Sequence, residues 1–393
     1  MKINVAVLFG GKSVEHEVSV ISALQAMRAM DAGKYEIYPV YITKGNEFYH
    51  GAALRDVEGY RDLPALLKKC GRVGLVAEGS KTYLESREKR GFLKSGRIAL
   101  IDLAFPIVHG TNVEDGALQG YLKTLNLPFV GCDVLASAVC MDKFSAKALL
   151  RQGGFPVLDC LRFEARAAGG LGGMAEAVEA RFPYPVVVKP VNLGSSVGIG
   201  RASDRAGLME ALETAFMFAG RVIAEPAVEN LKEVNCAVLG DADAAEASEC
   251  EEPYATEEIL SYSDKYMDGG KQGAAKGMAG LKRRIPADIS SEMRAKIRQI
   301  ATESFKFLDC CGVARADFLI DTATGGVWLN EFNTIPGSLS FYLWEPTGLS
   351  YADLLDRLIA LALKRRRVEE EIIYSFDTNI LSTGGGFGRK GKI

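Results

Sequence analysis

The sequence predicts an α/β protein with more than one domain, on three observations. The chain has 393 residues, which is enough for two or three domains of ordinary size. Apolar strands alternate with helical patterns along its first third, as in a parallel sheet covered by helices. Hydrophobic residues make up 48% of the chain and charged residues 25%, the ordinary balance of a soluble globular protein.

The first block, residues 1–140, begins with a strand, a glycine turn and a helix. Residues 3–9 are a continuous apolar run, and Gly10 and Gly11 separate this run from a helical pattern at 18–30. The start resembles dinucleotide-binding folds but lacks their full three-glycine fingerprint. Further elements are expected as strands at 35–42, 100–108 and 128–131 and as a helix at 115–125. We expect a doubly wound parallel sheet in this block.

Two further blocks and a tail follow. In the second block, residues 141–228, helices are expected at 143–152, 174–181 and 203–219, and strands at 157–163, 185–189 and 222–225. The third block, residues 229–370, contains a hairpin with acidic residues and ends in a long helix at 351–367. Residues 371–393 form a tail whose end is rich in glycine and basic residues, and we expect the tail to be flexible.

Charge, cysteines and histidines argue against several classes of protein. The net charge of −3 gives no indication of a nucleic-acid partner. The eight cysteines lack metal-ligand spacing and predict unpaired thiols in a reducing compartment. His16, His50 and His109 have no nearby partners for a zinc enzyme or a Ser-His-Asp hydrolase. The chain enters a strand directly and has no apolar run of membrane-spanning length, so we expect a cytoplasmic protein without a membrane partner.

The acidic hairpin at residues 312–333 is the first chemical signal. Its two apolar strands are joined by a Thr-Gly-Gly turn, and side chains alternate between the faces of each strand. One pairing register places Arg315, Asp317, Glu331 and Asn333 on the same surface. Two carboxylates and an amide oxygen, without His or Cys, suit Mg²⁺, which takes oxygen ligands and shares them with phosphates. The alternative is an exposed edge hairpin whose acids are solvated.

A serine-rich loop is the second chemical signal. Gly194, Ser195 and Ser196 can present backbone N–H groups and hydroxyls to an anion. Lys189, at the end of a predicted strand, can add a positive charge to the same phosphates. The loop lacks the ending of a Walker motif, and its alternative is a turn that needs the flexibility of glycine. Beside a predicted Mg²⁺ site, phosphate binding is the better interpretation.

Five motifs in order give the chain a resemblance to a known family. They are GGKSVEHEVSVISA (10–23), HGTNVEDGALQG (109–120), MDK (141–143), VKPVNLGSSVG (188–198), and RADFLID with NEFNTIPG (315–337). They resemble the motifs of the D-alanine–D-alanine ligases, which belong to the ATP-grasp superfamily, and the similarity runs from residue 2 to about 370. One departure is Val113, where the family's second motif usually has glycine.

The resemblance implies a fold and a reaction. The fold would be a three-domain ATP-grasp architecture, with an N-terminal Rossmann-like parallel sheet domain and two α+β domains that clamp ATP. In the reaction, ATP would phosphorylate one D-alanine, and the amine of a second D-alanine would attack the acylphosphate. The implied cofactors are ATP and two Mg²⁺ or Mn²⁺ ions. A homodimer and a place in peptidoglycan precursor synthesis are further expectations from the family.

The resemblance also assigns roles to individual residues. Asp317, Glu331 and Asn333 match the metal ligands. Residues expected to bind the phosphates, adenine or ribose of ATP are Lys143, Lys189, Ser195, Ser196, Glu225, Glu233, Lys265 and Asn330. Arg315 and the backbone N–H of Gly337 match groups that stabilise the tetrahedral intermediate.

The first D-alanine would be held mainly by a hydrogen-bonded trio. This trio is Glu15, Ser195 and Tyr266, with Glu15 on the substrate's ammonium. His16 and His109 are also expected at the substrate. An alternative for Glu15 is a first-turn acid favoured by the helix dipole. Residues 261–280, which include Lys265 and Tyr266, are expected to form a lid over the phosphates, or else a disordered surface loop. Ligases of this family that accept D-lactate usually have a histidine in this segment. Here the segment has Tyr266 and no histidine, which resembles the ligases that accept D-alanine.

The second substrate's pocket departs from the family. Tyr342 stands where the family has a serine near the carboxylate of the second substrate, and Ser338 or Ser340 is a candidate to replace that serine. The alternative is that the surrounding aromatic residues pack the C-terminal domain. Another D-amino acid or D-hydroxy acid acceptor, or a nucleotide sensor without catalysis, therefore stays open. The acidic stretch at 241–252 is expected to be a hairpin turn with a solvated face and no function.

Overall fold

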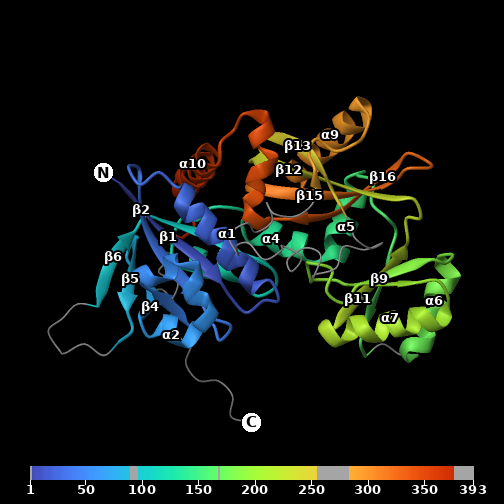
Figure 1. Ribbon diagram of the computed structural model, residues 1–393, viewed down its shortest axis with the longest axis horizontal. Helices are drawn as coiled ribbons and strands as arrows, with labels where there is room; N and C mark the ends of the chain where they lie inside the picture. The colour runs from blue at the N-terminus through green and yellow to red at the C-terminus, as the bar shows by residue number, and fades with distance from the viewer. Residues whose placement is uncertain (1, 89–95, 167–168, 255–282, 376–393) are drawn as a thin grey trace, which may run out of the picture.

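The computed structural model describes residues 2–88, 96–166, 169–254 and 283–375. These residues build three β-sheets with helices against them, which confirms the α/β class and the expected three-part architecture. The first sheet occupies one end of the molecule, and the second and third sheets lie toward the other end (Figure 1). Among the helices of the described residues, none is long and apolar enough to cross a membrane.

The first sheet has the order β6-β5-β4-β3-β2-β1-β7, with parallel pairing at its β7 side and an antiparallel extension beyond β2. β1 (Ile3–Gly10) pairs in parallel with β2 (Tyr35–Ile42) and with β7 (Leu103–Val108). The extension consists of β3 (Phe48–His50), β4 (Gly71–Glu78), β5 (Lys81–Ser86) and β6 (Arg97–Ile101). The sheet is therefore mixed rather than parallel throughout as was expected, and only β2, β1 and β7 at one side of it are parallel.

Two strand predictions in this region are wrong. The expected strand at 100–108 is two strands, because β6 and β7 lie at opposite edges of the sheet. The break falls at Asp102, whose carboxylate accepts a hydrogen bond from the backbone N–H of Asn4 (2.8 Å). The expected strand at 128–131 is a single bridge between Ala104 and Phe129.

Helices from both ends of the chain cover the first sheet. α1 (His16–Ala29) follows β1, and α10 (Tyr351–Glu370) packs against α1 (Figure 1). Apolar residues of α10 recur on one helix face and join the core of β1, β2 and β7: Leu354, Leu355, Leu358, Ile359 and Ala362. Shorter helices complete this region: η1 (Ala52–Arg55), η2 (Val57–Asp62), α2 (Leu63–Leu67) and α3 (Ala117–Thr124). The expected domain boundaries stay predictions.

The second sheet is antiparallel, in the order β10-β9-β11-β8. Its strands are β8 (Leu161–Glu164), β9 (Val186–Pro190), β10 (Gly200–Ala202) and β11 (Arg221–Pro226). One face packs on α6 (Gly170–Arg181) and α7 (Arg205–Phe218) through Val186, Val188, Val222 and Ala224. Because side chains alternate along a strand, Lys189, which follows Val188, and Glu225, which follows Ala224, lie on the other face. α4 (Val134–Met141) and α5 (Lys143–Gln152) precede this sheet.

The third sheet has the order β14-β13-β12-β15-β16. Its strands are β12 (Leu231–Gly240), β13 (Ala245–Pro253), β14 (Arg283–Arg284), β15 (Gly312–Asp321) and β16 (Gly326–Asn333). One face carries apolar residues that pack with α9 (Ser291–Phe307), and the other face carries polar residues. η4 (Gly337–Leu343) and η5 (Glu345–Thr347) connect β16 to α10.

Candidate active site

One cavity gathers most of the residues that the sequence singled out. The predicted residues that line it are Glu15, His109, Lys143, Lys189, Ser195, Ser196, Glu225, Glu233, Arg315, Asp317, Asn330, Glu331, Asn333 and Gly337. His16, Ser338 and Tyr342 are not among the lining residues. Lys265, Tyr266 and the rest of the expected lid lie outside the described residues. The cavity therefore brings together the expected metal ligands and most of the residues expected to bind the nucleotide and the first substrate.

The hairpin forms in the register that places its polar residues together. Arg315 pairs across the strands with Asn333, and Asp317 pairs with Glu331. The register shifts after Asp317, where β16 contains a bulge at Asn330. A bulge changes the direction of a side chain within a strand, so Asn330 and Glu331 both reach the cavity. The expected hairpin is confirmed, and the alternative of a solvated edge hairpin is not, because its acids line the cavity.

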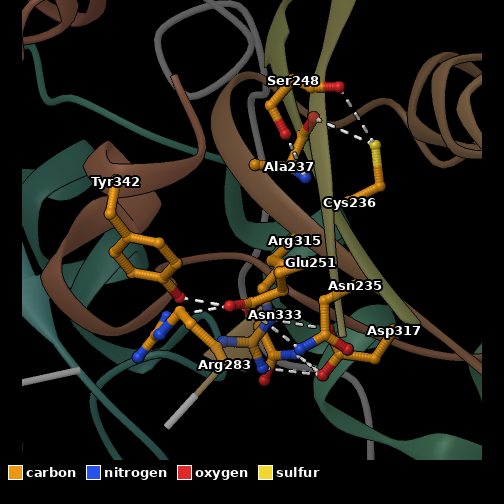
Figure 2. A network of polar contacts seen from close by, with 10 residues as sticks. All are labelled: Asn235, Cys236, Ala237, Ser248, Glu251, Arg283, Arg315, Asp317, Asn333 and Tyr342. Carbon is orange, nitrogen blue, oxygen red and sulfur yellow. Dashed lines mark hydrogen bonds and ion pairs between the residues drawn. The ribbon is translucent and has the colours of Figure 1, made fainter. Parts of the chain in front are cut away.

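Arg315 and Asp317 form a bidentate ion pair inside the cavity wall (Figure 2). Nε and Nη2 of Arg315 donate to the two carboxylate oxygens at 2.6 and 2.7 Å. The side-chain amide of Asn333 donates to the same carboxylate at 2.9 Å. Burial alone would lower the pKa of Arg315, but the charge and hydrogen bonds of Asp317, with smaller contributions from Tyr342 and Glu251, together outweigh burial and hold that pKa well above its usual value. Arg315 therefore stays protonated and oriented.

Lysine side chains connect the hairpin to the second sheet. Nζ of Lys143 lies 3.0 Å from Oε2 of Glu331, and it also donates to the backbone carbonyl of Leu193 (2.6 Å). Nζ of Lys189 donates to the amide oxygen of Asn330 (3.1 Å). Two lysines therefore stand beside the hairpin acids, where phosphate oxygens shared with a cation could be bound.

Glu225 is buried between two lysines. Nζ of Lys147 lies 3.0 Å from Oε2 of Glu225, and Lys189 pairs with Oε1. Burial alone would raise the pKa of Glu225, but the two ammonium groups outweigh it and lower the pKa to about 2. Sequence reasoning missed Lys147. The available signal was its spacing, because Lys143 and Lys147 are four residues apart on α5 and so share one face of the helix.

The serine loop and the start of α1 meet at the cavity. The hydroxyl of Ser195 donates to Oε1 of Glu15, the residue that precedes α1. Ser195 and Ser196 both have left-handed backbone conformations, with φ of 56° and 59°. Such conformations cost L-residues free energy and are found where surrounding structure imposes them. Two members of the expected trio are therefore in contact, and the third, Tyr266, is outside the described residues.

Buried hydrogen bonds fasten the segment after β16 to the first sheet. His109 contacts the carbonyl of Ile335 through Nδ1 (2.7 Å) and the hydroxyl of Ser22 through Nε2 (3.0 Å). The Ser22 hydroxyl in turn accepts from the backbone N–H of Ser338 (2.9 Å). Glu114, which sequence reasoning did not single out, accepts from the backbone N–H of Ile335 (2.8 Å) and from that of Gly110 (2.9 Å). These bonds position Gly337 at the cavity.

His16 is occupied by the protein itself. Its Nδ1 lies 2.6 Å from the carbonyl of Gly11, and its Nε2 lies 2.8 Å from the hydroxyl of Tyr41. Burial lowers the pKa of His16 more than the hydrogen bond to Gly11 and the charge of Glu17 raise it. The residue therefore braces the glycine turn after β1, and its expected contact with substrate stays a prediction.

A second polar cluster, which sequence reasoning missed, lines the same cavity. It consists of Asn235, Glu251 and Arg283, joined to Tyr342 (Figure 2). Glu251 belongs to the acidic stretch that was expected to be solvated. That interpretation is wrong for Glu251, because this residue is only 2% exposed to solvent. The signal in the sequence was weak, because neighbouring acids of the stretch, such as Asp243, do face solvent.

The hairpin residues fit a hard divalent cation. Asp317, Glu331 and Asn333 offer only oxygen ligands from facing positions of two strands, beside lysines suited to phosphate. Within the described residues there is no group of three or more His, Cys, Asp or Glu that could hold a metal alone. Two carboxylates with an amide would therefore share such a cation with phosphate oxygens, rather than enclose it in an all-protein cage.

Fold and cavity together define an ATP-dependent ligase of the ATP-grasp class. Two family profiles match the chain, one described as D-ala D-ala ligase N-terminus at residues 4–132 and the other as D-ala D-ala ligase C-terminus at 149–360. The chain belongs to the D-alanine–D-alanine ligase family.

Individual relatives agree with this assignment. The chain is 36% identical to a D-alanine–D-alanine ligase of Thermosipho melanesiensis, over 96% of this chain and 98% of the relative. It is 39% identical to D-alanine–D-alanine ligase A of Chromobacterium violaceum, over 94% and 98%. Among solved structures, the D-alanine–D-alanine ligase of Coxiella burnetii matches with a TM-score of 0.77 and 32% identity, over 94% of this chain and 96% of that one. The VanG D-Ala:D-Ser ligase of Enterococcus faecalis matches with a TM-score of 0.76 and 32% identity, over 92% and 100%.

Proposed function

We propose that this protein joins two D-alanine molecules at the expense of ATP, to give D-alanyl-D-alanine for peptidoglycan precursors. One observation carries the proposal. The register of the hairpin places Asp317 opposite Glu331 in the cavity that also holds Glu15 and Arg315. Groups suited to phosphate, to a divalent cation and to an amino acid thus line one cavity. Membership of the ligase family supports the same assignment.

The first step is transfer of the γ-phosphoryl group to the donor carboxylate. A carboxylate oxygen of the first D-alanine attacks the γ-phosphorus, the bond to ADP breaks, and an acylphosphate forms. Lys143 and Lys189 would neutralise charge on the phosphates, and Glu15, held by Ser195, would bind the donor's ammonium. Two Mg²⁺ or Mn²⁺ ions held by Asp317, Glu331 and Asn333 would supply further neutralisation of phosphate charge when bound.

The second step is formation of the peptide bond. The amine of the second D-alanine attacks the carbonyl carbon of the acylphosphate, and inorganic phosphate leaves. Negative charge develops on the carbonyl oxygen in the tetrahedral intermediate. Arg315, kept protonated and oriented by Asp317, and the backbone N–H of Gly337 would stabilise that oxyanion. Exclusion of water from the active site during the reaction would protect the acylphosphate from hydrolysis.

The test is the product formed from ATP, Mg²⁺ and D-alanine alone, identified by mass, together with the phosphate released. We expect one D-alanyl-D-alanine for each phosphate. Release of phosphate only after addition of another D-amino acid or a D-hydroxy acid would contradict the D-alanine acceptor. ATP binding without any release would contradict a ligase and favour a nucleotide sensor. Asn333→Ala should abolish most turnover in a ligase, whereas a sensor would only bind ATP more weakly.

We also propose that the protein is a homodimer in the cytoplasm. The dimer rests on the family resemblance, and a sedimentation measurement of mass in solution tests it. The compartment is supported by the cysteines, all eight of which are free thiols, as expected under reducing conditions. Fractionation of cells that produce the protein tests the compartment.

A further inference from the structure

A row of polar residues crosses the third sheet and leads away from the proposed phosphate site. Glu331, Asp317, Asn235 and Glu251 occupy consecutive cross-strand positions on β16, β15, β12 and β13. Lys143 marks the phosphate end of the row, next to Glu331. Glu251 stands two strands beyond Asp317, a separation of about 10 Å at the usual spacing of strands. All five residues line the same cavity.

Glu251 uses both of its carboxylate oxygens within the protein (Figure 2). Oε1 accepts from the side-chain amide of Asn235 (3.0 Å) and from the hydroxyl of Tyr342 (3.3 Å). Oε2 accepts from Nη1 of Arg283 (2.8 Å). With both oxygens engaged, Glu251 holds the side chains of Asn235, Arg283 and Tyr342 in place.

Arg283 is the side chain that Glu251 presents to the cavity. Its Cζ atom lies 3.9 Å from the centre of the Tyr342 ring, so the guanidinium stacks on the ring while it donates to Glu251. The side chain of Arg283 is 9% exposed and lines the cavity, whereas Tyr342 does not. A planar guanidinium fixed on two sides is suited to bidentate recognition of a carboxylate.

Stability alone does not account for this cluster. Taking an ion pair out of water costs about as much as the pair gains, so a buried pair such as Arg283 and Glu251 is a weak stabiliser. The proposed reaction, in contrast, needs a cation at this place. The acceptor brings a carboxylate that does not react, and Arg315 is already paired with Asp317. Tyr342, where the family resemblance expects a serine, directs its hydroxyl to Glu251.

We propose that Arg283 binds the carboxylate of the acceptor D-amino acid, and that Glu251 and Tyr342 are positioning residues for its guanidinium. The inference rests on the proposed function and adds a specificity determinant to it. An acceptor without a free carboxylate should therefore be discriminated against, and the discrimination should depend on Arg283.

The test is a competition between two acceptors. D-Alaninamide has no free carboxylate, so it can serve only as acceptor when D-alanine is the donor. The protein is supplied with ATP, Mg²⁺ and both compounds, and the dipeptide and its amide are separated by mass. For Arg283→Gln we expect kcat/KM for D-alanine as acceptor to fall roughly 10- to 100-fold, the range for losing a hydrogen bond to a charged group. Use of D-alaninamide should change little, so the product ratio should shift toward the amide.

Arg284→Gln is the matched control. Arg284 is the neighbouring residue of β14, but its side chain is 50% exposed and pairs with Asp288. Its substitution should leave the product ratio at the wild-type value. Glu251→Gln and Tyr342→Phe should raise the KM for the acceptor while kcat stays closer to the wild-type value, because they loosen Arg283 without removing it.

One further variant separates an effect on folding from an effect on function. Arg283→Gln leaves Glu251 without this cation, so the double variant Glu251→Gln with Arg283→Gln, which buries no unpaired charge, is measured beside it. A folded single or double variant with the wild-type product ratio would overturn the inference and leave the proposed function intact. Wild-type protein that forms neither the dipeptide nor its amide would overturn the proposed function itself, and the inference with it.

Discussion

Lys147 and Glu225 form an ion pair with 3.0 Å between Nζ and Oε2, although each side chain is only 1% exposed. Lys189 pairs with the other carboxylate oxygen. In Glu225→Gln, two buried ammonium groups would face a neutral amide, so we expect the free energy of unfolding to fall by about 3–5 kcal/mol. Denaturant unfolding measures this loss. Glu164→Gln, at an exposed position of the same sheet, should stay within about 0.5 kcal/mol of wild type.

The same pair predicts a pH dependence. The pKa of Glu225 is lowered from 4.5 to about 2, so its contribution to stability is complete above pH 4.5 and is lost as the pH falls toward 2. At 1.36 kcal/mol for each pKa unit, the loss is about 3 kcal/mol. The difference in unfolding free energy between wild type and Glu225→Gln should therefore shrink across this window. A difference that is constant with pH would contradict the lowered pKa.

His16 predicts a second pH effect, with its window at higher pH. Burial lowers the pKa of this histidine in the folded protein from 6.5. The unfolded chain then binds a proton below about pH 6.5 that the folded chain does not bind, so His16 reduces stability as the pH falls below this value. His16→Gln should show a shallower loss of stability than wild type as the pH falls below about 6.5. Equal slopes for the two proteins would show that His16 titrates normally.

Gly11 and Val113 should be coupled. Gly11 has a φ of +99°, and a Cβ atom there would lie 2.5 Å from Cγ1 of Val113. Gly11→Ala combines backbone strain of about 1–2 kcal/mol with this clash. In a Val113→Gly background the clash disappears and the strain remains, so the cost of Gly11→Ala should drop by about 1 kcal/mol or more. Thermal or denaturant unfolding of the four proteins in the cycle measures the coupling, and additive costs would rule out the contact.

The facing acids of the hairpin should both be needed for turnover. Asp317→Asn and Glu331→Gln each remove a carboxylate proposed to share a divalent cation with phosphates, so we expect at least about a 100-fold loss of kcat. ADP formation at saturating ATP measures the effect, together with the Mg²⁺ concentration needed for half-maximal rate. Asp321→Asn, at the far end of β15 from Arg315 and outside the cavity lining, should keep most of the activity. Near wild-type turnover in either site variant would exclude the proposed metal role.

The site could be predicted from sequence where residues close in the chain determine its geometry. The hairpin is local, and alternation along two strands is enough to bring Arg315 and Asp317 beside Glu331 and Asn333. The helix that carries Lys143 and the strand that ends near Lys189 were also predicted well, at 143–152 and 185–189. In these places the pattern of apolar residues predicts the helix or strand, and the motif predicts which of its residues face the site.

Other features depend on pairing between distant parts of the chain. Glu251 is buried because β13 pairs with β12 and approaches η4, which no local pattern reveals. The strands β3, β4 and β5 escaped prediction because they are mostly short or interrupted by polar residues, and they form by antiparallel addition at the edge of β2. The bulge at Asn330 interrupts the alternation on which the prediction relied.

The packing of α10 has a consequence for how the chain folds during its synthesis. The parallel part of the first sheet, β2, β1 and β7, is complete in sequence by Val108, but part of its core is supplied by residues of α10, from Tyr351 onward. The hydroxyl of Tyr35, at the start of β2, also donates to Asp356 (2.7 Å). A nascent chain on the ribosome would therefore carry an incompletely covered sheet through most of its translation. Chains truncated before α10 should expose that apolar surface and depend on chaperones to stay unaggregated.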